Sequence, residues 1–220
     1  MALSNPITIR IQAGGGGSVP SYISSMSAFQ RRALSGSYAP TNGTTSLQSI
    51  APGIWGGNMN IINPWCGGPK PTSGTKMYVH GGGHHDSSNN GMYSFDFAGT
   101  TRPTGWAVEN QGQTGIADTY GLSIGATGYP VSVHTYDGMV DMGTALYRIG
   151  GSQHDNGFFT DLAVRFDKAS KVWTRLPNYP GGEGAAGMAL GNPALGKILF
   201  MERWGTYQTY AFYRVATNNW

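Results

Sequence analysis

Short apolar stretches, each ended by glycines, recur along most of the chain. Residues 78–80 run into three consecutive glycines and residues 147–149 run into two, and a second apolar stretch follows at 92–96 and at 162–167. Alternation of apolar and polar positions over several residues predicts β-strands that present side chains to both faces of a sheet. Glycine pairs permit the positive φ angles of the tight turns between such strands. The pattern therefore predicts an all-β chain.

Two parts of the chain repeat each other at many positions. Each has an apolar strand, a glycine pair, a His-Asp step, a second strand that ends in Phe-Asp, and a tryptophan. The first copy runs from Tyr78 to Trp106 and the second from Tyr147 to Trp173. A third, more degenerate copy has strands at 197–201 and 210–213, with Glu202-Arg203 in place of the glycine pair. We therefore interpret most of the chain as an internal repeat.

Each repeat unit is expected to contain four strands. One strand precedes each copy, at 58–62, 138–141 and 187–190, and the segment that begins at each tryptophan adds the last strand. A sheet this small cannot bury its own side chains, so neighbouring sheets must stack, with the tryptophan filling the space between them. The order of apolar strand, Gly-Gly, aromatic-Asp and Trp resembles the kelch repeat over residues 52–220. The resemblance implies a kelch-type β-propeller of four-stranded blades.

The predicted blades account for the chain from residue 51 onward. We divide it into an N-terminal arm and lead-in at 1–50 and blades at about 51–128, 129–179 and 180–220. Propellers have four to eight blades, so three blades predict part of a larger ring that more chain or another molecule completes. Residues 7–11 alternate strictly between apolar and polar, and are the candidate for an added outer strand or for pairing with a neighbouring molecule.

Composition narrows the classes of function. The chain has 14 basic and 11 acidic residues, and Arg31-Arg32 is its one adjacent basic pair, so we expect no nucleic-acid partner. A single cysteine excludes an intramolecular disulfide and a cysteine-only zinc site. The N-terminus lacks the pattern of a signal peptide, and no apolar run has the length of a membrane span. We therefore expect a soluble protein.

The repeated His-Asp steps are the first candidate site. They follow the glycine turns of two neighbouring units and comprise His84, His85 and Asp86 in the first and His154 and Asp155 in the second. If both loops share one face, these groups could bind a divalent metal or act as acid and base. Because the feature repeats with the fold, we favour the interpretation that Asp caps turn amides and His packs on the next blade. We therefore expect loop-face binding candidates and no metal.

Cys66 and Tyr136 form a second candidate site. Cys66 precedes the first Gly-Gly strand and Tyr136 precedes the second, and these placements look like those of galactose oxidase, a copper-radical enzyme on a kelch propeller. In that family a cysteine of one unit is bonded to a tyrosine of the next, and this tyrosine binds copper. Only these two residues match the family, and Gln153 stands where its stacking Trp is expected. The alternative to a catalytic pair is that Cys66 is a buried cysteine that packs as a small hydrophobic residue.

These observations favour a non-catalytic propeller that serves as a binding or assembly module. The low charge and the N-terminal arm suit an oligomer or a structural component of a large particle, such as a phage virion, whose partners are other protein subunits. One alternative is a galactose oxidase-like oxidoreductase acting on a primary alcohol or sugar, the one interpretation that needs copper. Another is a carbohydrate-binding propeller whose aromatic surface would stack on a glycan. The candidates for that surface are Trp55, Trp204 and Tyr207.

Overall fold

The computed structural model describes nine parts of the chain, and their regular elements are strands and turns. These parts are residues 67–69, 71–72, 74–81, 89–96, 105–112, 128–153, 157–182, 187–202 and 209–220. They contain strands β1 to β12 and one 3₁₀ turn, so the predicted all-β class is confirmed. Within this part of the chain, no helix has the length and apolar character needed to cross a membrane.

The first sheet belongs to the first predicted unit. It consists of β1 (Lys76–His80), β2 (Met92–Asp96) and β3 (Gly105–Asn110), each antiparallel to the next. The pairing of β2 with β3 is irregular between Met92 and Tyr93. The further strand predicted at 58–62 lies outside the described residues. This sheet therefore shows three of the four strands expected of its unit.

The second sheet shows all four strands expected of its unit. They are β5 (Met139–Asp141), β6 (Ala145–Ile149), β8 (Ala163–Asp167) and β9 (Trp173–Arg175), antiparallel and in the order of the chain. A two-stranded ribbon of β4 (Val133–His134) and β7 (Ser152–Gln153) lies at one end of this sheet. The strands that the repeat predicted at 138–141 and 162–167 are therefore confirmed.

The third sheet repeats the same strand order. It consists of β10 (Gly187–Asn192), β11 (Lys197–Glu202) and β12 (Tyr210–Arg214). The 3₁₀ turn Pro193–Leu195 joins β10 to β11; the Asn192 side chain caps its start and Gly196 ends it at φ 59°. Gly196 is in the left-handed region, where glycine has no steric penalty.

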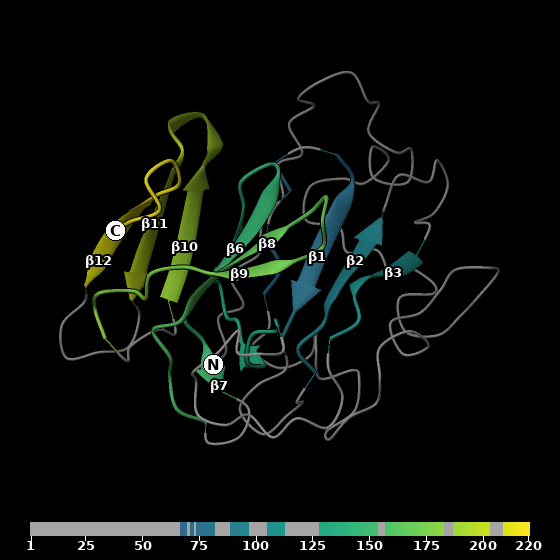
Figure 1. Cartoon of the computed structure of the whole chain (residues 1–220), viewed down its shortest axis with the longest axis horizontal. Coiled ribbons are helices and arrows are strands. Elements are labelled where there is room, and N and C mark those ends of the chain that lie inside the picture. Colours follow the sequence, from purple (N-terminus) through teal and green to yellow (C-terminus); the bar gives the residue numbers. More distant parts are fainter. Residues whose placement is uncertain are drawn as a thin grey trace, which may run out of the picture.

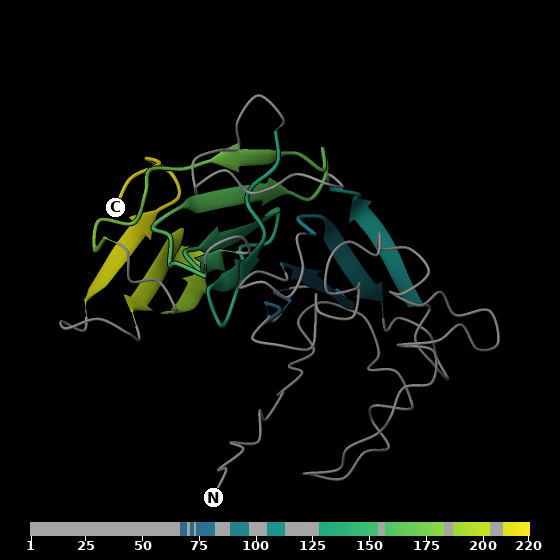
Figure 2. The same ribbon diagram turned by 90° about the horizontal axis from the view of Figure 1, so that it is seen from below.

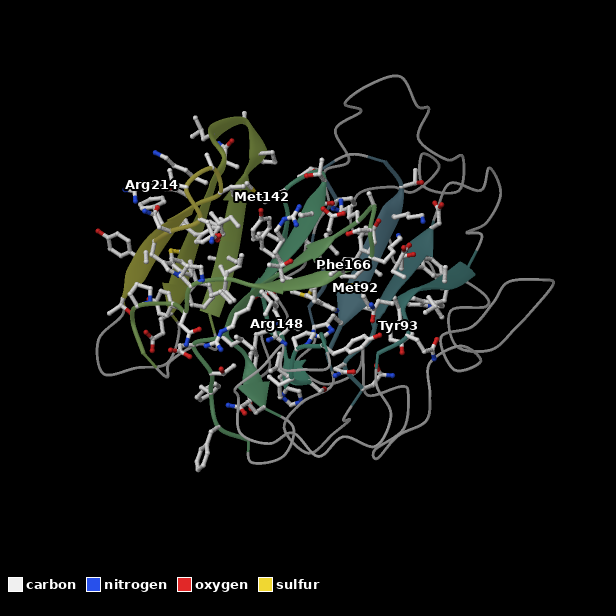
Figure 3. The ribbon with its side chains drawn as sticks, in the orientation of Figure 1. Met92, Tyr93, Met142, Arg148, Phe166 and Arg214 are labelled. Atoms are coloured by element: carbon white, nitrogen blue, oxygen red, sulfur yellow. The ribbon has the colours of Figure 1, made fainter. Side chains whose placement is uncertain are left out.

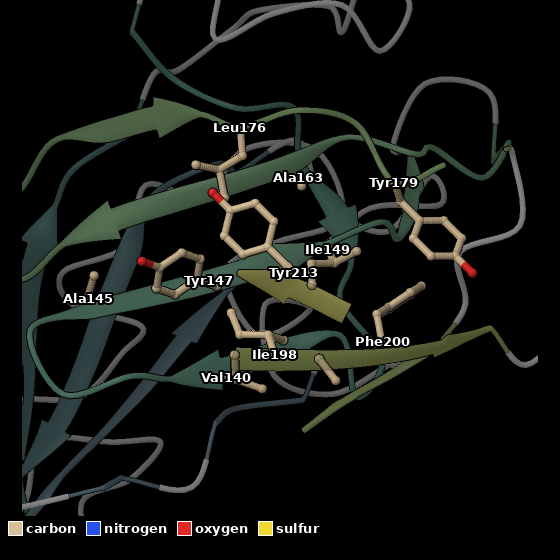
Figure 4. Packing of buried hydrophobic residues seen from close by; sticks show 11 residues of the cluster. Val140, Ala145, Tyr147, Ile149, Ala163, Leu176, Tyr179, Ile198, Phe200 and Tyr213 are labelled. Atoms are coloured by element: carbon tan, nitrogen blue, oxygen red, sulfur yellow. The ribbon is translucent and has the colours of Figure 1, made fainter. Parts of the chain in front are cut away.

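The three sheets follow one another in chain order across the molecule (Figures 1 and 2). One core lies between the first and second sheets and contains Tyr78, Met92, Leu146 and Phe166. The other lies between the second and third sheets, where Tyr147 meets Tyr213 with ring centroids 6.0 Å apart (Figure 4). The second sheet is thus covered on both faces, as a stacked repeat requires.

Candidate functional site

The ends of β1 and β6 meet in a buried polar pair. The Nδ1 atom of His80 lies 2.9 Å from the Gly91 carbonyl oxygen, and its Nε2 lies 3.1 Å from Nη1 of Arg148. The same Nη1 donates to the Val131 carbonyl oxygen at 2.7 Å. Both side chains are fully buried, and Figure 3 places Arg148 in the middle of the molecule.

These contacts require a neutral His80. The Arg148 guanidinium can only donate, so Nε2 accepts from it and Nδ1 carries the proton that is donated to Gly91. Burial, and then the positive charge of Arg148, lower the pKa of His80 from its ordinary value of 6.5 to about 3. A histidine held neutral in this way is a structural link between two sheets rather than a proton carrier near neutral pH.

A second group surrounds the β4–β7 ribbon, where Val133 pairs with Gln153 and His134 with Ser152. Tyr136 follows β4 with a backbone φ of 47°, in the left-handed region that residues other than glycine rarely adopt. Its ring lies 5.8 Å from that of His134, edge-on, and 6.4 Å from that of Phe159.

Gln153 of β7 adds a buried polar atom to this group. Its side-chain oxygen finds no hydrogen-bond partner among the described residues, although the residue is only 7% exposed. Such unsatisfied buried oxygens are uncommon in native proteins, and a bound water or ion is one of the features that accounts for them. The β4–β7 end of the second sheet, with Tyr136 and Gln153, is therefore the best described candidate for a binding surface.

Gly67 connects this end of the second sheet to the preceding unit. The hydroxyl oxygen of Thr135 accepts from the Gly67 amide at 3.0 Å and donates to the Gly67 carbonyl oxygen at 3.1 Å. A Cβ at position 67 would lie 2.0 Å from the Tyr136 carbonyl oxygen, so only glycine fits this approach. The residue bonded to Cys66 therefore lies against the backbone of Tyr136.

Most of the predicted site residues lie outside the described residues. Those are Trp55, Cys66, His84, His85, Asp86, His154, Asp155, Trp204 and Tyr207. The strands that lead into the two His-Asp loops do come together, since His80 ends β1, Arg148 is the penultimate residue of β6, and their side chains are 3.1 Å apart. The shared face that a metal or acid–base site would need is therefore still a hypothesis.

Sequence reasoning did not single out His80 or Arg148. A usable signal was present, because Arg148 stands between Tyr147 and Ile149 in an otherwise apolar strand of the second unit. A charged residue in such a run must be buried with partners. The pattern could have predicted a buried Arg, but not that its partner would be 68 residues away in the sequence.

The described residues do not complete a copper site. Tyr136 is the one residue among them that matches the galactose oxidase pattern, with the His134 ring beside it. Across the described part of the chain, no group of three or more His, Cys, Asp or Glu side chains is placed to hold a metal ion. We therefore derive no reaction step that passes through copper.

Comparison with known proteins does not assign the chain to a family. No protein-family model matches the chain, and no curated protein does. The chain is similar to the solved structure of YjhT at 13% sequence identity and a TM-score of 0.39, over 70% of this chain. The match covers 37% of the YjhT chain, so this chain spans well under half of that structure. The class of protein that the strands and sheets define is all-β.

Proposed function

We propose that the chain is a non-catalytic assembly module built from kelch-type propeller blades, and a structural component of a large particle such as a phage virion. The blade interpretation is supported by the four-stranded second sheet and by the stacking of three sheets in chain order. The assembly role is carried by one observation, which is the open apolar face of the third sheet.

The third sheet uses one face for the core and leaves the other face open. Its residues Ala189, Ile198, Phe200 and Tyr213 pack toward the second sheet. The opposite side is here called the outer face; it carries Asn192, Lys197 and Arg214 at one end and, over the rest, six apolar residues. They are Met188, Leu190, Leu199, Met201, Tyr210 and Phe212.

The outer face is far more exposed than an ordinary apolar cluster. Tyr210 is 71% exposed, Leu190 50% and Phe212 48%. Contiguous apolar patches of this kind on soluble proteins mark contact sites for other molecules. A sheet whose second face is uncovered therefore supports a role in assembly.

Radical footprinting at submicromolar concentration tests this proposal. Tyr210 and Tyr213 lie on the same strand and point to opposite faces, at 71% and 2% exposure, so they are an internal matched pair. We expect hydroxyl radicals to label Tyr210 several times faster than Tyr213, as measured by mass spectrometry of peptides. Equal protection of the two rings would mean that the outer face is already covered within one chain, and the assembly role would fail.

A galactose oxidase-like enzyme is the second candidate, favoured by the contact of Gly67 with Thr135. This contact brings Gly67, the residue that follows Cys66, against the backbone of Tyr136. The resemblance implies a bond between Cys66 and Tyr136. In the thioether, a carbon–sulfur bond replaces the Cys66 S–H bond and a ring C–H bond of Tyr136. Dioxygen takes up the two hydrogen atoms and becomes hydrogen peroxide.

Intact mass after aerobic incubation with copper(II) tests this candidate. The oxidase interpretation predicts a mass lower by two hydrogen atoms and a cross-linked peptide that joins Cys66 to Tyr136. Cys66→Ser and Tyr136→Phe are the matched controls, and neither should lose the hydrogens in this way. An unchanged mass in the parent chain would exclude the oxidase interpretation without affecting the assembly role.

A further inference from the structure

The outer face of the third sheet is organised in cross-strand rows. Residues paired across neighbouring strands point to the same face, and the register defines three rows. They are Met188–Met201–Tyr210, then Leu190–Leu199–Phe212, then Asn192–Lys197–Arg214. Two apolar rows are therefore followed by a polar row that carries two positive charges at one end of the sheet.

The outer face corresponds to a packed face of the second sheet. In the second sheet Val140 pairs with Tyr147, just as Leu190 pairs with Leu199 in the third. Val140 and Tyr147 are buried in the core between the second and third sheets. The equivalent positions of the third sheet are Leu190 and Leu199. Their apolar character suits contact with a following sheet, but the described residues contain no such sheet.

The described residues offer no other open sheet face as a partner. Both faces of the second sheet are covered. On the first sheet, the side that points away from the second carries Val79, Tyr93 and Phe95, which are at most 4% exposed, and Val108 at the β3 edge, which is 40% exposed. Apart from that edge, this side is closed to a head-to-tail contact between copies, whereas the outer face of the third sheet is available on every copy.

The size of the outer face suits a contact between two copies. With about 150–250 Å² for a large side chain, the exposed fractions correspond to roughly 500 Å² of apolar surface per copy. Two copies would bury roughly 1,000 Å², which reaches the lower range of specific interfaces. The two apolar rows carry no charge, so no charged group of these rows loses its hydration.

The charged row then determines the orientation. Lys197 and Arg214 are paired directly across β11 and β12, and Figure 3 shows Arg214 on the far side of the third sheet from the second. A two-fold axis that lies between the two faces and runs parallel to the rows, perpendicular to the strands, places the basic rows of the two copies at opposite ends, where they do not repel each other. The arrangement is self-complementary.

We propose that two copies of this chain pack the outer faces of their third sheets against each other in a two-fold symmetric dimer. This inference rests on the proposed assembly role and names the partner of the outer face as a second copy. Leu190, Leu199 and Phe212 form its central row, and Lys197 and Arg214 lie at its margins.

Sedimentation of the 220-residue chain over a concentration series tests the dimer. We expect the mass to rise from 23.4 kDa toward twice that value with increasing concentration. The face variant Leu190→Glu/Phe212→Glu should weaken the association at least about 30-fold, because it buries carboxylates at the centre of the contact. The matched control Phe158→Glu/Val172→Glu changes two side chains that are 64% and 55% exposed outside the third sheet, and should dimerise like the parent.

Footprinting keeps the test independent of how well the variants fold. In the parent chain, labelling of Tyr210 should fall toward that of Tyr213 as the dimer forms. A mass of 23.4 kDa at all concentrations, with Tyr210 labelled throughout, overturns the dimer and leaves the assembly role in place. Protection of Tyr210 at the lowest concentration overturns both. A dimer in which Tyr210 stays labelled, or which the control variant dissociates equally, places the contact elsewhere and also overturns the inference.

Discussion

Between pH 6.5 and pH 4 the protein should lose stability at about 1.4 kcal/mol per pH unit, because His80 must stay neutral in the folded state. Burial and the Arg148 charge lower its pKa to about 3, whereas an unfolded histidine has a pKa of 6.5. The unfolded chain therefore binds a proton in this window and the folded chain does not. Stability is highest above pH 6.5 and falls as the pH is lowered toward 3. Urea unfolding at several pH values measures the slope.

His80→Gln isolates this effect from other acid-sensitive groups. A glutamine amide can donate to the Gly91 carbonyl and accept from Arg148, but it does not titrate. The variant should have a flatter dependence of the free energy of unfolding on pH. Two carboxylates with lowered pKa values, Asp167 (held at about 2, chiefly by a bond from the Ser170 amide) and Glu109, also lose their contribution to stability as the pH falls toward their unfolded values of 3.8 and 4.5, so the slopes are compared above about pH 5. A parent slope that His80→Gln leaves unchanged would contradict the prediction, as would an NMR titration in which the imidazole assigned to His80 protonates near pH 6.5 in the folded chain.

Replacing Asp141 with alanine should destabilise the fold by about 3–5 kcal/mol, because it leaves a largely buried ammonium without its counter-charge. Both carboxylate oxygens of Asp141 accept from Lys168 at 2.7 Å, and the Thr72 hydroxyl and the Gly143 amide also donate to it. The Asp141 side chain is 1% exposed and that of Lys168 is 16% exposed. Thermal and urea unfolding measure the loss.

A double variant separates the lost charge pair from lost packing. Asp141→Leu with Lys168→Met removes both charges together, and should cost less than Asp141→Ala alone because no buried charge is left unpaired. Asp137→Asn changes an exposed carboxylate near the same sheet and should shift stability by no more than about 0.5 kcal/mol. If Asp141→Ala is as mild as Asp137→Asn, the pair does not stabilise the fold.

The repeat made the second sheet predictable from its residues. Phe166 and Trp173 recur at matching places in the first two units, and both are buried in the core between the first and second sheets. Local alternation and glycine turns define such strands because the pattern of neighbouring residues specifies which side chains share a face. For that reason the strands at 138–141 and 162–167 appear where the sequence predicted them.

The candidate sites were less predictable, because they depend on contacts distant in the sequence. His80 meets Arg148, and Gly67 meets Thr135, across 68 residues in each case. Neither pair has a local pattern that identifies its partner. Among the predicted site residues, Tyr136 is the one that the structure describes, and its position beside Gly67 follows from how two units pack.

By itself, the sequence determined the all-β class, the repeat and the positions of most described strands, since these follow from short-range alternation and turn residues. The tertiary structure decided which faces those strands cover. In the third sheet both faces are apolar, with Met188 and Leu190 on one side and Ile198 and Phe200 on the other, so the pattern alone assigns neither to the core. Only the stacking of the second sheet on Ile198 and Phe200 leaves Leu190 and Phe212 open, because burial depends on which surface the neighbouring sheet reaches.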